Sequence, residues 1–258
     1  MELTNWRELS DRGPDLVLCL DFPGGRAVAG FADLAAGVPV DACFLHIGST
    51  GAGPLAACVD RWAAELTATG RPVRAVLGFC AGTAMATRLA DAIAVTGPPP
   101  MVVLFDAVPT TGESLTGQFT SALEASAKHL TADELADARE LAEQLLATCP
   151  DDLPRIAATL TDRYDRLMRA VADRLSLHEY FRKELTDGFA GYLDYLLLAT
   201  EGGFDMGTTT PLFITSPGQE PPVEDARIIA LDIDHADLLR DPQVHKLVAD
   251  LLTGDHPW

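Results

Sequence analysis

The feature that most constrains the fold of this chain is a set of short apolar segments that alternate with helical patterns. Each apolar segment is bounded by Gly, Pro or Asp, and each is long enough for one strand. Uninterrupted segments of this length are typical of central strands in a parallel sheet, where helices cover both faces. They lie at 15–22, 41–49, 73–79, 101–107, 211–216 and 226–233.

Helical periodicity follows several of these segments. After the second one, apolar residues recur at positions 55, 59, 62, 63 and 66, and Gly70 provides a C-terminal stop. Residues 82–97 follow the third segment in the same way. Strand and helix in alternation predict an α/β fold with a mainly parallel twisted sheet and helices on both faces.

The alternation stops after Pro109. Residues 111–200 contain no convincing strand but several helical segments, among them 132–147, 153–175 and 178–199. A chain of 258 residues with 48% hydrophobic content is long enough for one large core. We therefore predict an α/β core of residues 1–110 and 201–258, interrupted by a helical lid insertion at 111–200.

Charge and hydropathy narrow the classes of partner. The net charge of −19 argues against nucleic acid and anionic membrane, because both would be repelled. No run of about 18 uncharged apolar residues is present, and the first 13 residues lack the basic and then apolar pattern of a secretion signal. We expect a cytoplasmic protein that binds neither nucleic acid nor membrane.

The cysteines do not form a recognisable metal or disulfide pattern. They are five in number and show neither C-x-x-C spacing nor an accompanying histidine pair. We therefore expect no disulfide framework, no metal and no other cofactor. Four of them are interpreted as buried structural thiols, namely Cys19, Cys43, Cys58 and Cys149.

Cys80 stands apart because of its surroundings, VLGFCAGTAMA at residues 76–86. The G-x-C-x-G pattern is a cysteine version of the nucleophile elbow, in which the nucleophile occupies a strained turn between a strand and a helix. Any side chain at Gly78 or Gly82 would crowd that backbone. We predict that Cys80 is a catalytic nucleophile; the alternative is a small buried residue where helix meets sheet.

A cysteine nucleophile needs a base, and the base needs an acid to orient it. In the elbow fold the chain order is nucleophile, acid, histidine. His235 directly follows the last apolar segment and is the predicted base, the alternative being a solvated loop histidine beside Asp234 and Asp237. Two acids follow strands between these residues, Asp106 and Glu220, and either strand end is placed to reach the histidine.

Acyl transfer also needs N–H donors for the developing oxyanion. The amide of Ala81, the first residue after the nucleophile, is one predicted donor. The second is expected in the loop after the first strand, DFPGGRA, where Pro23 has no N–H. We therefore predict Gly24, with a simple tight turn as the alternative use of the Gly-Gly pair.

With these residues placed, the sequence resembles the thioesterase branch of the α/β-hydrolase superfamily that works with polyketide and nonribosomal peptide synthases. The likeness covers nearly the whole chain and is carried by GFCAG, VVLFDA, the helical insertion and DIDHADLLRDPQVHKLVADLL. In that last stretch the family has a histidine, then a leucine pair, then a final helix opened by a proline. The resemblance implies an α/β-hydrolase fold, a carrier-protein partner and Asp106 as the acid.

The sequence differs from the thioesterase branch in two ways, and both differences indicate a smaller group. Members of the branch commonly have a serine nucleophile and a Pro-His dipeptide before the Gly-Gly, whereas this chain has Cys80 and Phe22-Pro23. It is more similar to the stand-alone Dieckmann cyclases of tetramate and pyridone pathways, which have a Cys-Asp-His triad. The resemblance implies transfer of a β-ketoacyl aminoacyl chain from carrier phosphopantetheine to cysteine, followed by ring closure. A type II-like thioesterase that hydrolyses the acyl thioester is the alternative.

Side chains of the insertion have two interpretations each. The aromatic and long apolar ones are candidates for an acyl pocket or, preferably, for helix packing: Tyr164, Leu167, Met168, Phe189 and Tyr192. Basic residues cluster at Arg155, Arg163, Arg166, Arg169, Arg174, Arg182 and Lys183. They form either a docking face for an acidic carrier protein or, as we favour, a solvated helix with i,i+4 pairs such as Asp162–Arg166 and Asp165–Arg169.

Overall fold

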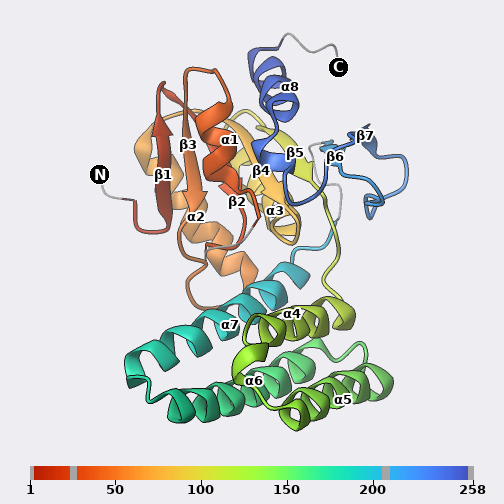
Figure 1. The fold of residues 1–258 in the computed structure, drawn as a ribbon. Helices are drawn as coiled ribbons and strands as arrows, with labels where there is room; N and C mark the ends of the chain where they lie inside the picture. Colours follow the sequence, from red (N-terminus) through yellow and green to blue (C-terminus); the bar gives the residue numbers. More distant parts are fainter. Residues whose placement is uncertain (1–2, 24–27, 205–209, 255–258) are drawn as a thin grey trace. The chain divides into compact units, whose positions relative to one another are not determined.

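The computed structural model describes residues 3–23, 28–204 and 210–254, except for the side chains of residues 179, 181, 182 and 185 (Figure 1). The chain divides into two compact units. Met1–Pro109 together with Ala199–Trp258 form the first, here called the sheet unit. Thr110–Leu198 form the second, the helical unit.

Seven strands form one sheet in the sheet unit, in the order β1-β3-β2-β4-β5-β6-β7. β1 pairs antiparallel with β3, and the other pairings are parallel. The predicted fold class, a mainly parallel α/β sheet, is therefore confirmed. The strands are β1 (Trp6–Asp11), β2 (Asp15–Leu20), β3 (Ala42–Ile47), β4 (Val73–Phe79), β5 (Met101–Phe105), β6 (Leu212–Thr215) and β7 (Arg227–Ala230).

Helices cover both faces of this sheet, because its central strands are apolar on both sides. Helices α1 (Phe31–Gly37) and α8 (Pro242–Thr253) share one buried cluster with side chains such as Phe44 and Leu77. Helices α2 (Leu55–Thr69) and α3 (Gly82–Ala94) lie against the opposite face. Burial of each large apolar side chain contributes on the order of 1.5–3 kcal/mol.

Two elements of the sheet unit, β1 and α1, are not marked by the sequence patterns. β1 is an edge strand: Trp6 is buried, but Arg7, Glu8 and Asp11 are exposed, so no uninterrupted apolar run marks it. α1 has only seven residues, which is less than two periods of helical patterning. Both elements are stabilised by tertiary packing more than by local sequence.

The helical unit is built from α4 (Gly112–Ala125), α5 (Ala132–Thr148), α6 (Leu153–Leu175) and the larger part of α7 (Glu179–Thr200). Side chains of Thr111, Thr131 and Asp152 accept hydrogen bonds from backbone N–H groups and so cap α4, α5 and α6. Short 3-10 turns complete the two units at Ala127–His129 and Leu238–Arg240. Within the described ranges, no helix has the length and apolar character needed to span a membrane.

Four of the five side chains that the sequence singles out lie buried in the helical unit, whereas Tyr192 is half-buried. The Tyr164 ring lies 4.3 Å from that of Phe189, whose ring lies 6.1 Å from that of Phe119. Leu167 and Met168 are buried beside them on α6. These positions agree with helix packing rather than with an open acyl pocket.

Four arginines of α6, Arg163, Arg166, Arg169 and Arg174, are ion-paired. Arg166 contacts Asp162 and Arg169 contacts Asp165, as the i,i+4 spacing predicts. Arg174 lies 3.0 Å from the carboxylate of Glu134 on α5. These guanidinium groups already face carboxylates, as expected for a solvated helix surface.

Candidate active site

The backbone turns sharply at Cys80, between the end of β4 and the start of α3. Its φ angle is 53°, in the left-handed region that a side chain other than that of glycine rarely adopts. The Cys80 N–H donates to the carbonyl of Phe105 (2.9 Å). The Cys80 carbonyl accepts from the N–H (3.2 Å) and from the hydroxyl (2.6 Å) of Thr83. These bonds hold a conformation that costs on the order of 1–3 kcal/mol.

Gly78 permits this turn by lacking a side chain. A Cβ atom at this position would lie 2.7 Å from the Cα of Thr83 and 2.9 Å from the Cβ of Ala86, both on α3. Contacts this short would push α3 away from the strand and displace Cys80. The strand-to-helix turn therefore has, at Gly78, the steric requirement that the elbow pattern predicts.

Cys80 differs in exposure from most of the other thiols. Cys19, Cys43 and Cys58 are buried, and burial raises the pKa of the Cys19 and Cys43 thiols, which keeps them protonated. Cys80 and Cys149 are partly exposed. None of the five forms a disulfide.

Asp106 directly follows β5 and also has a positive φ, 44°. Its side chain is fully buried but receives three hydrogen bonds. Oδ1 accepts from the backbone N–H of Ser216 (2.7 Å), and Oδ2 accepts from the Ser216 hydroxyl (2.7 Å) and from Nδ1 of His235 (2.7 Å). A buried carboxylate needs such donors, because burial without them is strongly unfavourable.

His235 lies in the turn that follows β7. Its Nδ1 bonds to Asp106, which places the proton on Nδ1 and leaves the Nε2 lone pair for use as a base. One face of the ring stacks on Phe79, with centroids 4.8 Å apart and an interplanar angle of 15°. The side chain is 38% exposed, so a proton can be exchanged at the free nitrogen.

These three residues come from different strand ends at the carboxyl edge of the sheet. Cys80 is bonded to Phe79, the residue that stacks on His235, and its N–H contacts the residue before Asp106. Glu220, the other candidate acid, is exposed in the segment after β6, while His235 contacts Asp106. The structure thus brings the imidazole together with the earlier of the two acids.

Of the two predicted oxyanion donors, Ala81 and Gly24, the structure describes only Ala81. Ala81 is buried at the N-cap of α3, so its N–H lies at the positive end of the helix dipole. Gly24 lies outside the described residues. After that gap, the Ala29 N–H donates to the carbonyl of Ala236, the residue that follows His235 (2.9 Å).

Comparison with known proteins identifies the fold. No family model and no curated protein matches this sequence. Solved structures do match over nearly the full chain. The thioesterase domain of Vlm2, bound with a dodecadepsipeptide, is 20% identical with a TM-score of 0.52, covering 97% of this chain and 96% of that one.

Two further thioesterase domains are similar. SrfTE, which cyclizes the lipopeptide antibiotic surfactin, is 11% identical with a TM-score of 0.51, covering 99% of this chain and 97% of that chain. The NocB domain, in a covalent complex with a fluorophosphonate nocardicin G analog, is 15% identical with a TM-score of 0.54, covering 97% and 99%. The chain has an α/β-hydrolase-like fold.

Two residues of this candidate site, Ser216 and Phe79, are not predicted from the sequence. Ser216 is the last residue of the apolar run PLFITS, and its value as a donor depends on β6 lying beside β5, which the run itself does not reveal. Phe79 occupies the variable position of the elbow pattern. A polar residue at the carboxyl end of a predicted central strand is the signal that points to Ser216.

Outside this site, the described residues include a cluster of potential metal-ligating groups on β1 and β3. Glu8, Asp11 and Cys43 have ligand atoms within 4.8 Å of one another, but Arg71 lies 3.2 Å from the Asp11 carboxylate, and burial keeps the Cys43 thiol protonated. A guanidinium and a protonated thiol disfavour a metal ion here.

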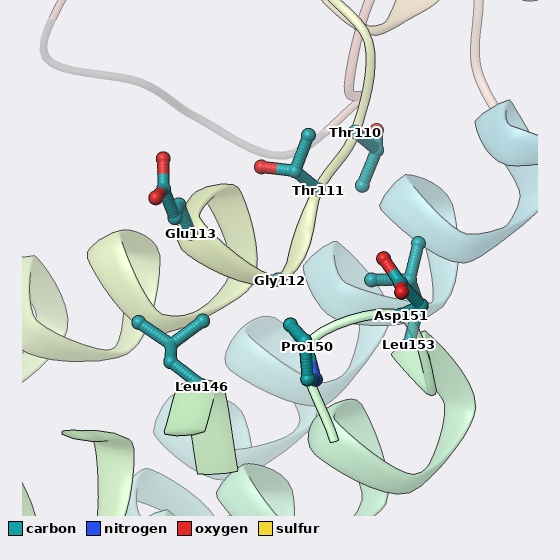
Figure 2. A pocket seen from close by; sticks show the side chains of 8 residues that line it. All are labelled: Thr110, Thr111, Gly112, Glu113, Leu146, Pro150, Asp151 and Leu153. Carbon is teal, nitrogen blue, oxygen red and sulfur yellow. The ribbon is translucent and has the colours of Figure 1, made fainter. Parts of the chain in front are cut away.

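A cavity of about 450 Å³ lies within the helical unit, where α4 begins near the α5–α6 connection (Figure 2). Its polar side chains include the carboxylates of Glu113 and Asp151, and it contains no cysteine or histidine. The full lining is Thr110, Thr111, Gly112, Glu113, Leu146, Pro150, Asp151 and Leu153. The cavity therefore lacks the groups needed for acyl transfer.

Proposed function

We propose that this chain is a Dieckmann-type cyclase that receives a β-ketoacyl aminoacyl group from the phosphopantetheine of a carrier protein and releases it as a tetramic acid or a pyridone. Cys80 is the nucleophile, His235 the base and Asp106 the acid. The observation that carries the proposal is a cysteine at a strained strand-to-helix turn, where the preceding residue, Phe79, stacks on a histidine whose Nδ1 bonds to a buried aspartate.

The first step is a thiol exchange. The Cys80 sulfur, its proton transferred to Nε2 of His235, attacks the thioester carbonyl. A tetrahedral oxyanion forms, stabilised by N–H donors such as that of Ala81. As it collapses, the carbon–sulfur bond to phosphopantetheine breaks, and the imidazolium returns the proton to the departing thiolate. The acyl group is then a thioester of Cys80, and His235 is neutral again.

The second step closes the ring. The methylene between the ketone and the amide of the acyl chain is acidic, and Nε2 of His235 takes one of its protons. The resulting carbanion attacks the Cys80 thioester carbonyl, a carbon–carbon bond forms, and the carbon–sulfur bond to Cys80 breaks. The cysteine leaves as a thiolate, stabilised by the protonated histidine. No water is consumed.

A cysteine suits this sequence of steps better than a serine does. A thioester is more reactive toward a carbon nucleophile than an ester, because sulfur delocalises poorly into the carbonyl and thiolate leaves easily. Ring closure is intramolecular, and effective molarities of about 10⁵ M or more allow it to compete with water. The proposal needs no cofactor of the enzyme, since phosphopantetheine belongs to the carrier protein.

Hydrolysis of the same acyl-enzyme is the second candidate function. The similar solved structures are described as thioesterase domains, and one of them cyclizes its product. A type II-like thioesterase shares the first step and differs only in the nucleophile that attacks the acyl-cysteine. The choice between the two functions therefore depends on the product.

A product-mass experiment separates the two. The purified chain is incubated with a synthetic β-ketoacyl aminoacyl thioester of N-acetylcysteamine, and the product is weighed by mass spectrometry. Loss of the thiol alone means ring closure, whereas loss of the thiol with gain of water means hydrolysis. We expect ring closure, and an exclusively hydrolysed product overturns the cyclase.

The cysteine's role is tested with a matched pair of variants. Cys149 is also partly exposed but lies outside the site, so Cys149→Ala is the control for Cys80→Ala. We expect the acyl adduct and turnover to survive in Cys149→Ala and to disappear in Cys80→Ala. Full turnover in Cys80→Ala would refute covalent catalysis by this residue.

A further inference from the structure

We infer that Ser216 is a positioning residue for catalysis: its hydroxyl fixes the Asp106 carboxylate and, through it, orients the imidazole of His235. The inference rests on the proposed function of the site and adds a fourth side chain to it. Ser216 and Asp106 are separated by 110 residues in the sequence but lie at the ends of the adjacent strands β6 and β5.

Both oxygens of the carboxylate are held by Ser216. The backbone N–H binds Oδ1 and the hydroxyl binds Oδ2, each at 2.7 Å. Two donors from one residue fix the rotation of the carboxylate about its Cβ–Cγ bond. Oδ2 is thereby aimed at Nδ1 of His235, also at 2.7 Å. If the hydroxyl is removed, Ser216 keeps only its N–H on Oδ1, and Oδ2 is held by His235 alone, so the plane of the carboxylate is less firmly fixed.

The hydroxyl can be separated from the role of Ser216 in the fold. Strand pairing at this point is carried by the backbone, since the Asp106 N–H donates to the carbonyl of Ile214 (3.0 Å) and Leu231 N–H donates to the carbonyl of Thr215 (2.9 Å). Substitution of the Ser216 side chain leaves these backbone bonds in place. It changes one donor, which is buried together with the carboxylate that it serves.

Because Ser216 and Asp106 are buried together, loss of the Ser216 hydroxyl should affect catalysis. Ser216 is 4% exposed and Asp106 is 1% exposed, so water does not readily replace a lost donor on Oδ2. A hydrogen bond to a charged acceptor is stronger than one between neutral groups. The oxygen that loses its donor is the same one that orients the base, so the effect should appear in the chemical step rather than in substrate binding.

The test compares Ser216→Ala and Ser216→Thr with a control, Thr87→Val. Thr87 is also buried, but its hydroxyl donates to the carbonyl of Ala84 within α3 and does not touch the site. Acylation of Cys80 by the N-acetylcysteamine thioester is followed in single turnovers. We expect acylation to be about tenfold slower in Ser216→Ala with KM within about twofold of wild type. Ser216→Thr should recover most of the rate, and Thr87→Val should match wild type.

A spectroscopic signature tests the positioning directly and needs no substrate. In the wild-type protein the Nδ1 proton of His235 should give a downfield NMR resonance, assigned by its absence in His235→Gln. We expect this resonance to broaden or shift in Ser216→Ala and to return in Ser216→Thr. A purely structural role would lower thermal stability without this change.

The possible failures are distinguishable. If wild type forms no acyl adduct, the proposed function fails, and the His235 resonance still decides whether Ser216 orients the imidazole. If Cys80 is acylated but Ser216→Ala matches wild type in both rate and resonance, the positioning role is overturned and the proposed function stands. A loss confined to KM, or one that Thr87→Val shares, also overturns the positioning role.

Discussion

His235 and His46 lie near strand ends in the same sheet unit, but in opposite environments. His235 bonds to a carboxylate through Nδ1, stacks on Phe79 and is partly exposed. His46, near the end of β3, is 6% exposed, and its Nδ1 has no hydrogen-bond partner among the described residues. Burial and, to a lesser degree, the charge of Arg7 lower the pKa of His46 to about 4.

The difference shows what an imidazole needs in order to act as a base. Taking up a proton creates a positive charge, which a buried site without a carboxylate cannot stabilise. His235 has such a carboxylate on its Nδ1, that of Asp106, while His46 packs near Phe31, whose ring lies 6.3 Å away. A histidine near a strand end is therefore not by itself a candidate base. The carboxylate partner of His235 distinguishes it from His46.

Replacing Asp106 by Asn should have the largest effect on this contrast. An amide lacks the negative charge that stabilises protonated His235, and its NH₂ group facing Nδ1 would favour the wrong tautomer. We expect turnover of the thioester to fall by about 10³- to 10⁴-fold. Single-turnover acylation, followed by intact-protein mass, measures it. Glu220→Gln is the control, and an equal loss in that variant would contradict the assignment of the acid.

His46 should make the free energy of unfolding depend on pH under acidic conditions. Unfolded His46 takes up a proton near pH 6.5, whereas folded His46 does so only near pH 4. Between these values the unfolded state binds more protons than the folded state. The contribution of His46 to the free energy of unfolding is therefore fully present above pH 6.5 and is lost as the pH falls toward 4. The loss should reach roughly 3 kcal/mol by pH 4.

Urea unfolding at pH 7, 6, 5 and 4 measures this loss as the difference between wild type and His46→Leu. The variant lacks the titrating group, so its free energy of unfolding should fall less steeply with acid. Parallel profiles for the two proteins would show that His46 does not contribute.

Removal of the stacked ring of Phe79 should reduce turnover by an intermediate amount. Phe79→Leu keeps an apolar side chain but removes the flat surface against His235. Aromatic pairs contribute on the order of 0.5–1.5 kcal/mol, so we expect turnover to fall about two- to tenfold. Phe31→Leu, beside His46, is the matched control and should leave turnover intact. Equal turnover losses in the two variants would contradict a specific role for the ring that stacks on His235.

The smallest effect is expected far from either histidine, at an exposed ion pair. Asp162 and Arg166 on α6 are mostly solvent-exposed, so the charge of their pairing is screened by water. Asp162→Asn should change the free energy of unfolding by less than about 0.5 kcal/mol. Chemical denaturation measures this, and a change above 1 kcal/mol would show that surface carboxylates matter here as buried ones do.

Much of the fold can be predicted because its central strands are apolar on both faces, which gives uninterrupted runs such as 73–79. β1 escapes that pattern, since an edge strand with exposed charges has only Trp6 to bury. The elbow is predictable because its steric demand falls on a glycine two residues before Cys80.

The rest of the site depends on which strands are neighbours. The sequence leaves Asp106 and Glu220 open until a family resemblance is invoked, and only the contact to His235 distinguishes them physically. Ser216 contributes through the adjacency of β5 and β6, across a gap of 110 residues that no local pattern bridges.

That gap has an evolutionary consequence. The entire helical unit is inserted between two residues that hydrogen-bond to each other, so its length and sequence can vary while the ends of β5 and β6 remain joined. On the return path to β6, Gly202 is tied to Arg88 of α3 (2.7 Å), which secures the chain before it re-enters the sheet. We therefore expect that changes in the inserted unit can leave the contact between Asp106 and Ser216 in place.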